Sequence, residues 1–588
     1  MISYLHRALL NRPFSIVVIA TLAAATLASK PLHAQILAPE FKAVNEQYVN
    51  LLGGDHWHIL AGTLEISEPL LAMPGANGDV QYVRYLSKQG EWRDNYKYLI
   101  DTSNPSSISV LTGEMSHVFL PGSMNIGGVD YLRDGRGNLL AISVINGSSS
   151  AKYIGRDGET VTFGGQDSGT SVSYPTGLTR VFYYKQKPAA SPPVSRLQSV
   201  VQNDGTMIKY TYDSDDGASN TGAWFHVANV AIINQAYDYC DQMADHCSFA
   251  PNASRSASFT GPVNYMALSG QTALEYATTS GGYGRTYRRD MYSRIVGIAE
   301  SRNGTDDLTI SYQDPFWGVS QITNSAGDVR TYSEIRQSEH YTVNVRSSYA
   351  NASDSYYFED SISMPTRFTD KLGRQTLYSW SSEEKRLLSV TYPEGNSEKF
   401  DYDTRSNVIV KKRVPKAQYN GTVLEEKANY DVTCENFNTC NQPNAYIDSK
   451  GNRTDFTYAS FGGRLSELRA SPTPGAARPL KLFTYVQRTA YVLTSARALM
   501  PTGQPIWMPS SETNCQTMPN SNTLSCDPSA TRTDTTYLYG ANGTPEALLV
   551  HGKREVSGNQ TKLTCYAYDR FRQKISETTP NANLQVCP

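Results

Sequence analysis

Three short segments carry side chains that could do chemistry. Asp167-Ser168-Gly169 resembles the nucleophile segment of serine proteases, but Gln166 precedes it instead of Gly, and no Asp and His arrangement recommends itself as partners. His56-Trp57-His58 places two imidazoles on one side of a strand, as zinc sites do, without an evident third ligand. Asp213-Ser214-Asp215-Asp216-Gly217 resembles the opening of a calcium loop, but it lacks the EF-hand spacing and closing Glu. Each segment has a plainer interpretation as a Gly/Ser loop, a β arm or a turn. We therefore predict a protein that is not an enzyme and has no catalytic residues, no metal and no cofactor.

The bulk composition points to β structure. A chain of 588 residues is long enough for two or more domains or a long repeat array. Its net charge of −2 gives no electrostatic reason to expect nucleic acid or an anionic membrane as a partner. The 39 Tyr and 43 Gly, with only 18% charged residues, favour pleated strands joined by tight turns.

The N-terminus has the features of an export signal. Arg7 and Arg12 precede the apolar stretch Phe14 to Ala28, and Ala34 offers a small residue before Gln35. The alternative is a membrane anchor, but this stretch is shorter than the roughly 20 residues that span a bilayer. We predict a signal peptide over residues 1–34 and a mature protein that is exported to the periplasm, the cell surface or the medium and is not membrane-embedded.

Export determines how the eight cysteines are interpreted. The chain has no CxxC, and no His lies at ligand spacing from a Cys pair. In an oxidising compartment, local disulfides that close short loops are the better interpretation. We predict four sequence-adjacent pairs: Cys240–Cys247, Cys434–Cys440, Cys515–Cys526 and Cys565–Cys587.

A repeated unit dominates the rest of the chain. Counted from Arg386 as zero, an apolar residue lies at +4, a Gly at +9, and two aromatic residues at +14 and +16. The same offsets recur from Arg196, Met364 and Gln442, and weaker copies contain Tyr153, Gly158 and Phe163, or Ile322, Gly327 and Tyr332. The clear copies consist of Val200, Gly205, Tyr210, Tyr212 and Asp213; Phe368, Gly373, Tyr378 and Trp380; Val390, Gly395, Phe400, Tyr402 and Asp403; Tyr446, Gly451, Phe456 and Tyr458; a further strand ending is Tyr566, Tyr568 and Asp569.

The parity of these offsets predicts the turn. A three-residue loop at +7 to +9 makes paired offsets sum to 16, so all even positions share one face. Such a loop favours Gly at its last position in the left-handed conformation. The aromatic residues then form a stripe along side-by-side hairpins, because one isolated hairpin is only marginally stable. Ser199, Lys209, Ser389 and Lys399 lie at odd offsets, so we expect the opposite face to meet water. Asp after the second ring is expected to turn the chain.

These motifs resemble a known family. R-L-x-S-V, then Gly, then Y-x-Y-D resembles the YD repeat of the Rhs proteins, which are exported or injected bacterial proteins related to the animal teneurins. The resemblance covers roughly residues 149 to 588. It implies a spiral β-sheet that closes a hollow shell, which in many members encloses a C-terminal toxin. The family's D-P-x-G core is not matched by Asp314-Pro315 or Asp527-Pro528, so self-cleavage and toxin activity are not carried over, and we expect the N-terminal part of a shell.

The predicted organisation follows from these observations. We expect an all-β fold in which residues 35–145 form a small β-rich region and residues 146–588 form a continuous curved or spiral array of YD-repeat hairpins. The segment Val227 to Cys247 interrupts the repeats, and we expect a short helix there.

Three functions remain open. The leading one is a non-enzymatic exported shell or scaffold, as in polymorphic toxin or cell-contact systems, which contains or presents an enclosed or downstream polypeptide. The alternative is a carbohydrate-binding module whose exposed tyrosines stack on cell-surface glycans. A hydrolase with its site in residues 35–145 is the third. Burial of the even face between layers would exclude glycan binding by that face.

Overall fold

The computed structural model describes residues 57–587, apart from residues 59–62, 65, 87–90, 105–106, 114, 120–122, 127–128, 146–147, 165–167, 188–193, 216–220, 248–254, 262–272, 301–305, 314–317, 350–351, 362–363, 383, 420 and 583. The regular secondary structure of the described chain is almost entirely β-strand, which confirms the predicted all-β class. The predicted signal peptide lies outside the described residues. Within them, no helix has the length and apolar character needed to cross a bilayer.

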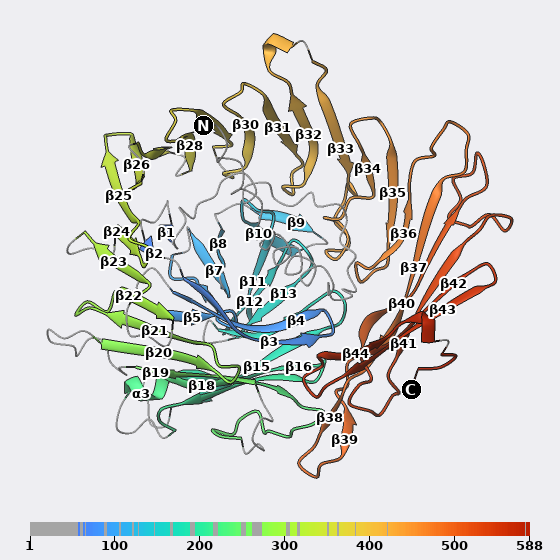
Figure 1. Ribbon diagram of the computed structural model, residues 1–588, viewed down its shortest axis with the longest axis horizontal. Helices are drawn as coiled ribbons and strands as arrows, with labels where there is room; N and C mark the ends of the chain where they lie inside the picture. The colour runs from blue at the N-terminus through green and yellow to red at the C-terminus, as the bar shows by residue number, and fades with distance from the viewer. Residues whose placement is uncertain are drawn as a thin grey trace, which may run out of the picture.

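One antiparallel sheet forms most of the molecule, and its strands pair in sequence order, apart from β37, which pairs with β40 (Figure 1). Its strands are β9 (Ser123–Ile126), β10 (Val129–Arg133), β11 (Leu139–Ile145), β12 (Ser148–Ile154), β13 (Thr160–Phe163), β14 (Gly169–Ser173), β15 (Thr179–Gln186), β16 (Ser195–Gln202), β17 (Thr206–Tyr212), β18 (Val227–Asn234), β19 (Arg255–Thr260), β20 (Ala273–Thr279), β21 (Gly284–Arg289), β22 (Ile295–Glu300), β23 (Leu308–Tyr312), β24 (Val319–Asn324), β25 (Val329–Arg336), β26 (His340–Ser347), β27 (Asp354–Glu359), β28 (Pro365–Thr369), β29 (Gln375–Trp380), β30 (Leu387–Thr391), β31 (Ser397–Tyr402), β32 (Val408–Val414), β33 (Leu424–Asn429), β34 (Ala445–Ile447), β35 (Arg453–Tyr458), β36 (Arg464–Leu468), β37 (Pro479–Arg488), β40 (Ile506–Gln516), β41 (Thr533–Tyr539), β42 (Val550–Ser557), β43 (Gln560–Tyr568) and β44 (Lys574–Thr578).

The sheet is open, and its first strand lies nearer the N-terminus than the sequence predicts. In the described part of the chain β44 pairs with β43 and β9 pairs with β10, with no pairing between β44 and β9. The sheet therefore begins at Ser123, inside the region 35–145 that the sequence sets apart. A short hairpin, β38 (Tyr491–Leu493) with β39 (Leu499–Pro501), projects between β37 and β40.

A smaller inner layer lies within the curve of the sheet (Figure 1). It consists of the sheet β3 (Ser67–Gly75), β4 (Gly78–Leu86) and β5 (Trp92–Asp94), and the sheet β6 (Tyr98–Asp101), β7 (Ile108–Thr112) and β8 (Met115–Phe119). β3 packs near β18 and β19, and β6 packs near β14. The main apolar core is formed between this layer and the sheet, and it includes buried residues from Leu64 to Phe358.

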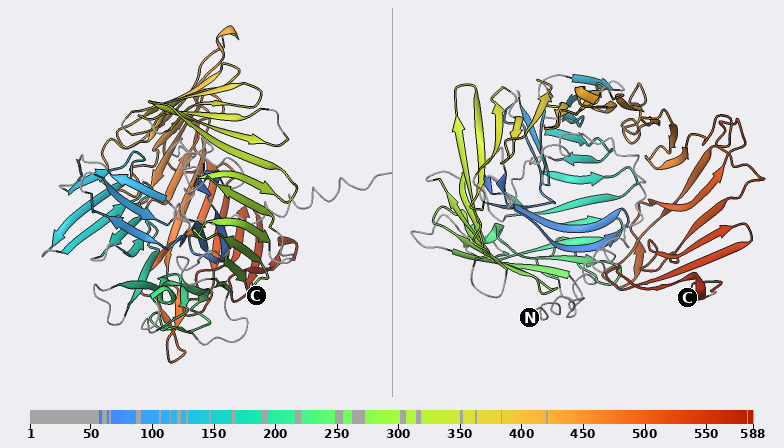
Figure 2. Two further views of the ribbon diagram at one scale, coloured as in Figure 1. Left: turned by 90° about the vertical axis from the view of Figure 1, so that its left-hand side faces the viewer. Right: turned by 45° about the horizontal axis from the view of Figure 1, so that its top comes forward.

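The sheet winds far enough that its later part meets its earlier part at the hairpin turns (Figures 1 and 2). Arg156 Nη2 donates to Asn407 Oδ1 across 251 residues of sequence. Farther along, Thr502 Oγ1 donates to the carbonyl of Asn203 across 299 residues, and Arg572 Nη2 donates to the carbonyl of Asp204 across 368 residues. We call this line of contacts the seam. It fixes the later part of the sheet against the earlier part, and no strand ladder crosses it among the described residues.

The segment from Val227 to Cys247 differs from its predicted form. The expected helix within it is wrong, because Val227–Asn234 is strand β18 and the rest is turns and irregular chain. The short helix α3 (Thr221–Phe225) precedes it. The β-branched residues Val230, Ile232 and Ile233 favour the strand, which pairs with β17 along its length.

Candidate functional site

The repeat unit has the register that its parity predicts. Val390 lies opposite Glu398, Val200 opposite Ile208, and Phe368 opposite Thr376, so paired offsets sum to 16. At the turn, the Tyr392 amide donates to the carbonyl of Asn396, which leaves a three-residue loop ending in Gly395. Gly395 has a φ of 88°, in the left-handed region that favours glycine.

The second ring of each unit has a role that the first ring lacks. Tyr402 Oη donates to the carbonyl of Leu387, and Tyr458 Oη donates to the carbonyl of Pro443. Trp380 Nε1 makes the equivalent bond to the carbonyl of Pro365, and each of these bonds spans 15 residues. The bond joins the end of the second arm to the start of the first, so it closes the hairpin at its open end. A signal was present in the sequence, because in the clear copies position +16 carries Tyr or Trp, whose side chains are donors, whereas +14 accepts Phe.

A β-bulge near the start of the first arm also escaped the sequence analysis. Trp380 pairs with Leu387 and Ser379 pairs with Ser389, so Leu388 is an extra residue in β30. The bulge turns Leu387 to the same face as Val390, and both are buried in one cluster with Phe400. Leu387 therefore lies on the face of the even-offset residues Val390, Phe400 and Tyr402 despite its odd offset. We call this the aromatic face.

The aspartates at strand ends act as turn caps. Asp403 Oδ1 accepts the amides of Arg405 and Asn407, and Asp569 Oδ1 accepts those of Phe571 and Gln573. Asp213 differs, because its carboxylate is 2.7 Å from His226 Nδ1. These contacts account for the aspartates without chemistry.

The described residues of the three segments that could do chemistry take part in strands, bridges and ion pairs. Ser168 forms a bridge with Leu99, and Asp167 lies outside the described residues. His58 lies in β1 (Trp57–His58), which pairs with β2 (Thr63–Leu64), and His56 falls outside the described part. Asp215 is paired with His246 at 2.8 Å, while Asp216 and Gly217 are outside the description. In the described residues no group of three or more His, Cys, Asp or Glu is placed to hold a metal ion.

One hydroxyl, imidazole and carboxylate do lie in a row. Thr112 Oγ1 is 3.0 Å from His117 Nε2, and His117 Nδ1 is 3.1 Å from Asp134 Oδ2. This is the order that nucleophilic catalysis uses. His117 is only 3% exposed, however, and Tyr153 Oη also approaches its Nε2 at 3.3 Å. Thr112, Asp134, Asn138 and Tyr153 surround the imidazole, and the row ties β8 to the main sheet.

Buried ions attach the inner layer to the covered part of the sheet. Arg84 of β4 contacts Glu68 and Glu275, both at 2.9 Å, and Glu275 also contacts Arg289 at 3.0 Å. Burial acts to raise the pKa of Glu275, but Arg84 and Arg289 hold that pKa below its ordinary value. The carboxylate therefore stays charged and paired. Removing one member would strand buried charge.

The aromatic face meets two different environments along the sheet. In β16 and β17 it packs under the inner layer, where Tyr210 lies edge-on to Tyr82 at 6.1 Å and donates to Asp94 Oδ2. The register of the strands from β25 to β30 shows that Tyr378 and Val390 lie on this same face of the sheet. There the buried cluster is formed by residues of β28–β32 and their connections and includes none from the inner layer. We call β12–β27 the covered region and β28–β36 the open region.

In the open region the aromatic face is mixed in character. Tyr378, Tyr446 and Tyr458 are half-buried, and burial raises the pKa of each hydroxyl to about 12. Lys411, which pairs with Phe400 across the strands, makes an ion pair with Glu398 at 3.1 Å on the same face. The face therefore offers rings and paired charges instead of a sealed core.

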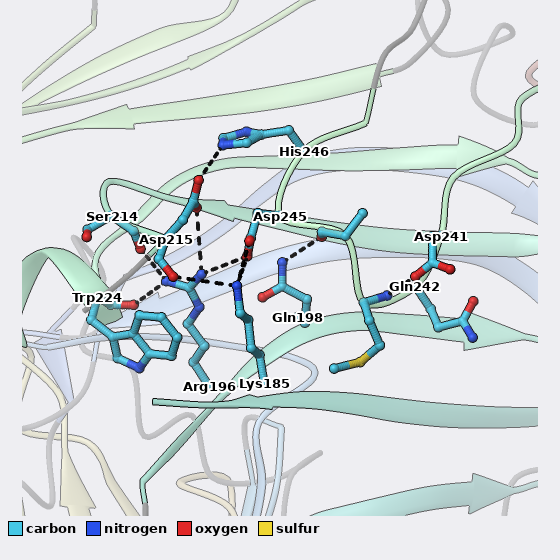
Figure 3. A network of polar contacts seen from close by, with 12 residues as sticks. Lys185, Arg196, Gln198, Ser214, Asp215, Trp224, Asp241, Gln242, Asp245 and His246 are labelled. Carbon is cyan, nitrogen blue, oxygen red and sulfur yellow. Dashed lines mark hydrogen bonds and ion pairs between the residues drawn. The ribbon is translucent and has the colours of Figure 1, made fainter. Parts of the chain in front are cut away.

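The opposite, outer face carries a polar cluster in the covered region (Figure 3). Lys185 contacts Asp245 at 2.5 Å, and the Arg196 guanidinium lies 3.7 Å from the centre of the Trp224 ring. The predicted exposure of Ser199 and Lys209 is wrong, because both are buried under the chain segment 235–247. Sequence alone could not place that segment. Burial lowers the pKa of Lys209 to about 8, although Asp245 and Asp241 oppose the shift.

The disulfides join the pairs that the sequence predicts: Cys240–Cys247, Cys434–Cys440, Cys515–Cys526 and Cys565–Cys587. Each closes a local loop, with sequence separations of 7, 6, 11 and 22 residues. Four such bonds are typical of proteins from an oxidising compartment.

Comparison with known proteins gives weak similarities. No family model matches the sequence, and no curated protein matches it. The chain is similar to the crystal structure of TcdB2-TccC3, with 10% identity and a TM-score of 0.26, over 86% of this chain and 30% of that one. It is also similar to the Photorhabdus luminescens Tc holotoxin pore, with 9% identity and a TM-score of 0.29, over 85% of this chain and 30% of that one. A third similar structure is TcdB2-TccC3 without its hypervariable C-terminal region, with 10% identity and a TM-score of 0.29, over 83% of this chain and 28% of that one.

The chain thus spans less than a third of the length of these structures. At 9–10% identity and these TM-scores, the similarity assigns neither a family nor a function to this chain. The resemblance to the Rhs family stays a prediction.

Proposed function

We propose that this protein is a non-enzymatic shell or scaffold segment whose aromatic face in the open region holds or presents another polypeptide. The contrast between the covered and open regions supports the proposal. In the covered region the same face already holds a polypeptide, the chain's own inner layer, through aromatic contacts and buried ion pairs. In the open region the described inner layer does not reach the cluster, and half-buried rings with paired charges remain.

The chemistry of the inner layer suggests what the open face would take. Tyr82, Trp92 and Tyr98 present rings to the sheet, and Arg84 and Glu68 present charges. A segment of extended chain with alternating aromatic and charged residues offers the same groups. Many weak contacts of this kind can hold a chain without demanding one sequence.

The test uses a defined probe, a reduced and carboxymethylated polypeptide that remains unfolded, labelled with a fluorophore. We expect saturable binding that weakens by at least about tenfold in the double variant Tyr378→Ser/Tyr446→Ser, since each ring contributes on the order of 1 kcal/mol. Lys427→Ser is the matched control, because Lys427 lies on the outer face opposite Ile447. Equal binding by both variants, or none by the wild type, would reject the proposal.

The carbohydrate alternative is limited to the open region. Glycan stacking on Tyr210 or Tyr212 is excluded by burial beneath the inner layer. Titration with neutral oligosaccharides in the same assay separates the two functions. Binding that depends on Tyr378 and Tyr446 for sugars but not for the polypeptide would favour the binding module.

We also infer that the protein is exported, on the basis of its N-terminal sequence and its four disulfides. Mass analysis of the mature protein should give an N-terminus at Gln35. An intact N-terminus in a membrane fraction would contradict the inference.

A further inference from the structure

The segment 242–245 lies on the outer face of β15–β17 in the manner of a bound peptide (Figure 3). Its main-chain carbonyls are held by side chains of the sheet. Gln198 Nε2 donates to the carbonyl of Ala244 at 2.8 Å, and Ser199 Oγ and Lys209 Nζ donate to the carbonyl of Gln242 at 2.8 and 3.1 Å. Carbonyls two residues apart are thus gripped from one side.

The carboxylate of Asp245 completes this recognition. Lys185 Nζ donates to both of its oxygens, at 2.6 and 2.5 Å, and Arg196 Nη2 donates to Oδ1 at 3.2 Å. The guanidinium is itself oriented by the Trp224 ring and by the carbonyls of Ser214 and Trp224. The sheet therefore presents two cations to one carboxylate, a geometry that favours charge-assisted hydrogen bonds.

The surface beneath the segment is one that can face water. Ser199 pairs with Lys209 across β16 and β17, as Ser389 pairs with Lys399 at the same offsets in β30 and β31. In the second hairpin Lys399 is exposed, whereas Lys209 is only 2% exposed. Removing the segment would uncover polar side chains at positions that tolerate water elsewhere in the array.

The segment also leaves part of the site unused. Arg196 Nε and Gln198 Oε1 are buried without a hydrogen-bond partner in the described structure. Buried polar atoms of this kind are normally paired, so they mark positions that a ligand could satisfy. Gln198 is fully buried and Arg196 is 3% exposed, so bulk water does not reach them.

We propose that the outer face of β15–β17 is a binding site for an extended peptide that bears a carboxylate, and that in the oxidised protein the chain's own segment 242–245 occupies it, held in place by the Cys240–Cys247 disulfide. The site lies opposite the aromatic face and does not depend on the function proposed above. A tethered occupant competes at an effective concentration in the millimolar range, so a second peptide binds only when the tether opens.

Opening requires a dithiol reductant. One thiolate attacks Sγ of Cys247, which is half-buried, and Cys240 leaves as a thiolate that takes up a proton. The second thiol of the reductant then displaces Cys247 and forms the reductant's own disulfide. Two electrons and two protons pass to the protein, which gains two thiols.

The test compares a permanently open variant with the closed protein. Cys240→Ser/Cys247→Ser should bind a capped peptide of sequence QMADH, whereas the wild type should bind it only after treatment with a dithiol. Replacing the Asp of the peptide by Asn, or introducing Lys185→Met, should weaken binding by roughly tenfold or more, as expected for a charge-assisted contact. Cys434→Ser/Cys440→Ser is the matched control and should not bind.

A second measurement keeps the proposal testable if the open variant does not fold. In Asp245→Asn, with the disulfide intact, amide hydrogen exchange of residues 242–245 should accelerate by roughly tenfold. Asp241→Asn should leave the exchange of Ala244 and Asp245 unchanged, because its carboxylate accepts from the Met243 amide, whereas Lys185 Nζ and Arg196 Nη2 donate to Asp245. Exchange that stays slow in Asp245→Asn, or peptide binding that ignores the Asp-to-Asn change, overturns the proposal.

Discussion

Two hairpins with the same sequence pattern lie in different surroundings. The hairpin β16–β17 belongs to the covered region and β30–β31 to the open region, and their loops end in Gly205 and Gly395 with φ of 86° and 88°. Tyr212 and Tyr402 both donate to a carbonyl 15 residues earlier. The first hairpin is nevertheless enclosed on both faces, by the inner layer and by segment 242–245. The repeat thus specifies the hairpin, and distant segments decide what each face meets.

The first ring of the unit should show the largest difference between the regions. Tyr210→Ala should cost about 4 kcal/mol, because it empties a fully buried position and leaves Asp94 without its phenol donor. Tyr378→Ala, at the same offset, should cost about 2 kcal/mol, because that ring is only half-buried. Native-state hydrogen exchange of each hairpin measures both values. Equal losses would mean that the inner layer adds nothing to the covered hairpin.

Replacing the turn glycine should destabilise the covered hairpin more than the open one, because only the covered turn lies at the seam. Gly395→Val should cost about 1–2 kcal/mol for the left-handed conformation alone. In Gly205→Val the new Cβ also meets Arg572 Nη2 and Val492 Cγ1, each at 3.3 Å, so we expect about 3 kcal/mol. The same exchange experiment applies. A smaller loss of stability in Gly205→Val than in Gly395→Val would show that Arg572 and Val492 move aside without destabilising the protein.

Removing the hydroxyl of the second ring should cost the same stability in both regions. Tyr212→Phe and Tyr402→Phe each remove one hydrogen bond to a main-chain carbonyl and should each cost about 1 kcal/mol. Differential scanning calorimetry or hydrogen exchange can resolve the change. If neither substitution has an effect, the ring acts through packing alone.

The lysines on the outer face should differ in their response to pH. Burial lowers the pKa of Lys209 to about 8 from its ordinary 10.5. Above pH 8 the folded state loses this proton while the unfolded state keeps it up to about 10.5, so this group makes the wild type more stable as pH rises through that window. Lys209→Met should abolish that gain, measured as the difference in unfolding free energy between wild type and variant.

Lys399→Met is the control at the same offset. It should leave the pH profile as in the wild type and change stability by less than about 0.5 kcal/mol, because the side chain is exposed. A pH response in Lys399→Met equal to that of Lys209→Met would contradict the difference in burial.

Sequence reasoning succeeded where the controlling contacts are local. The loop ending in Gly395, the shared face of Val390, Phe400 and Tyr402, and the four loop-closing disulfides all depend on residues that are near in sequence. Parity and turn chemistry are sufficient for such features. The hydroxyl bond of the second ring could also have been anticipated, from the restriction of +16 to Tyr or Trp in the clear copies.

It failed where distant segments meet. Nothing in Ser199 or Lys209 indicates that residues 242–245 will cover them, and nothing in Arg572 indicates a partner at Asp204. The row formed by Thr112, His117 and Asp134 likewise joins β7 and β8 to the turn after β10. These contacts depend on how far the sheet curves, which follows from the sum of many small twists along it.

The seam also sets an order in time. During synthesis at roughly 5–20 residues per second, the turn at Asp204 is made on the order of 20–70 s before Arg572, which lies 368 residues later. Contacts between such distant residues slow folding, because a long loop must close before they form. The early hairpins must therefore persist with the inner layer alone as support, and the later strands arrive on a surface that is already folded. The later strands therefore add one after another to a folded unit made of the early hairpins and the inner layer.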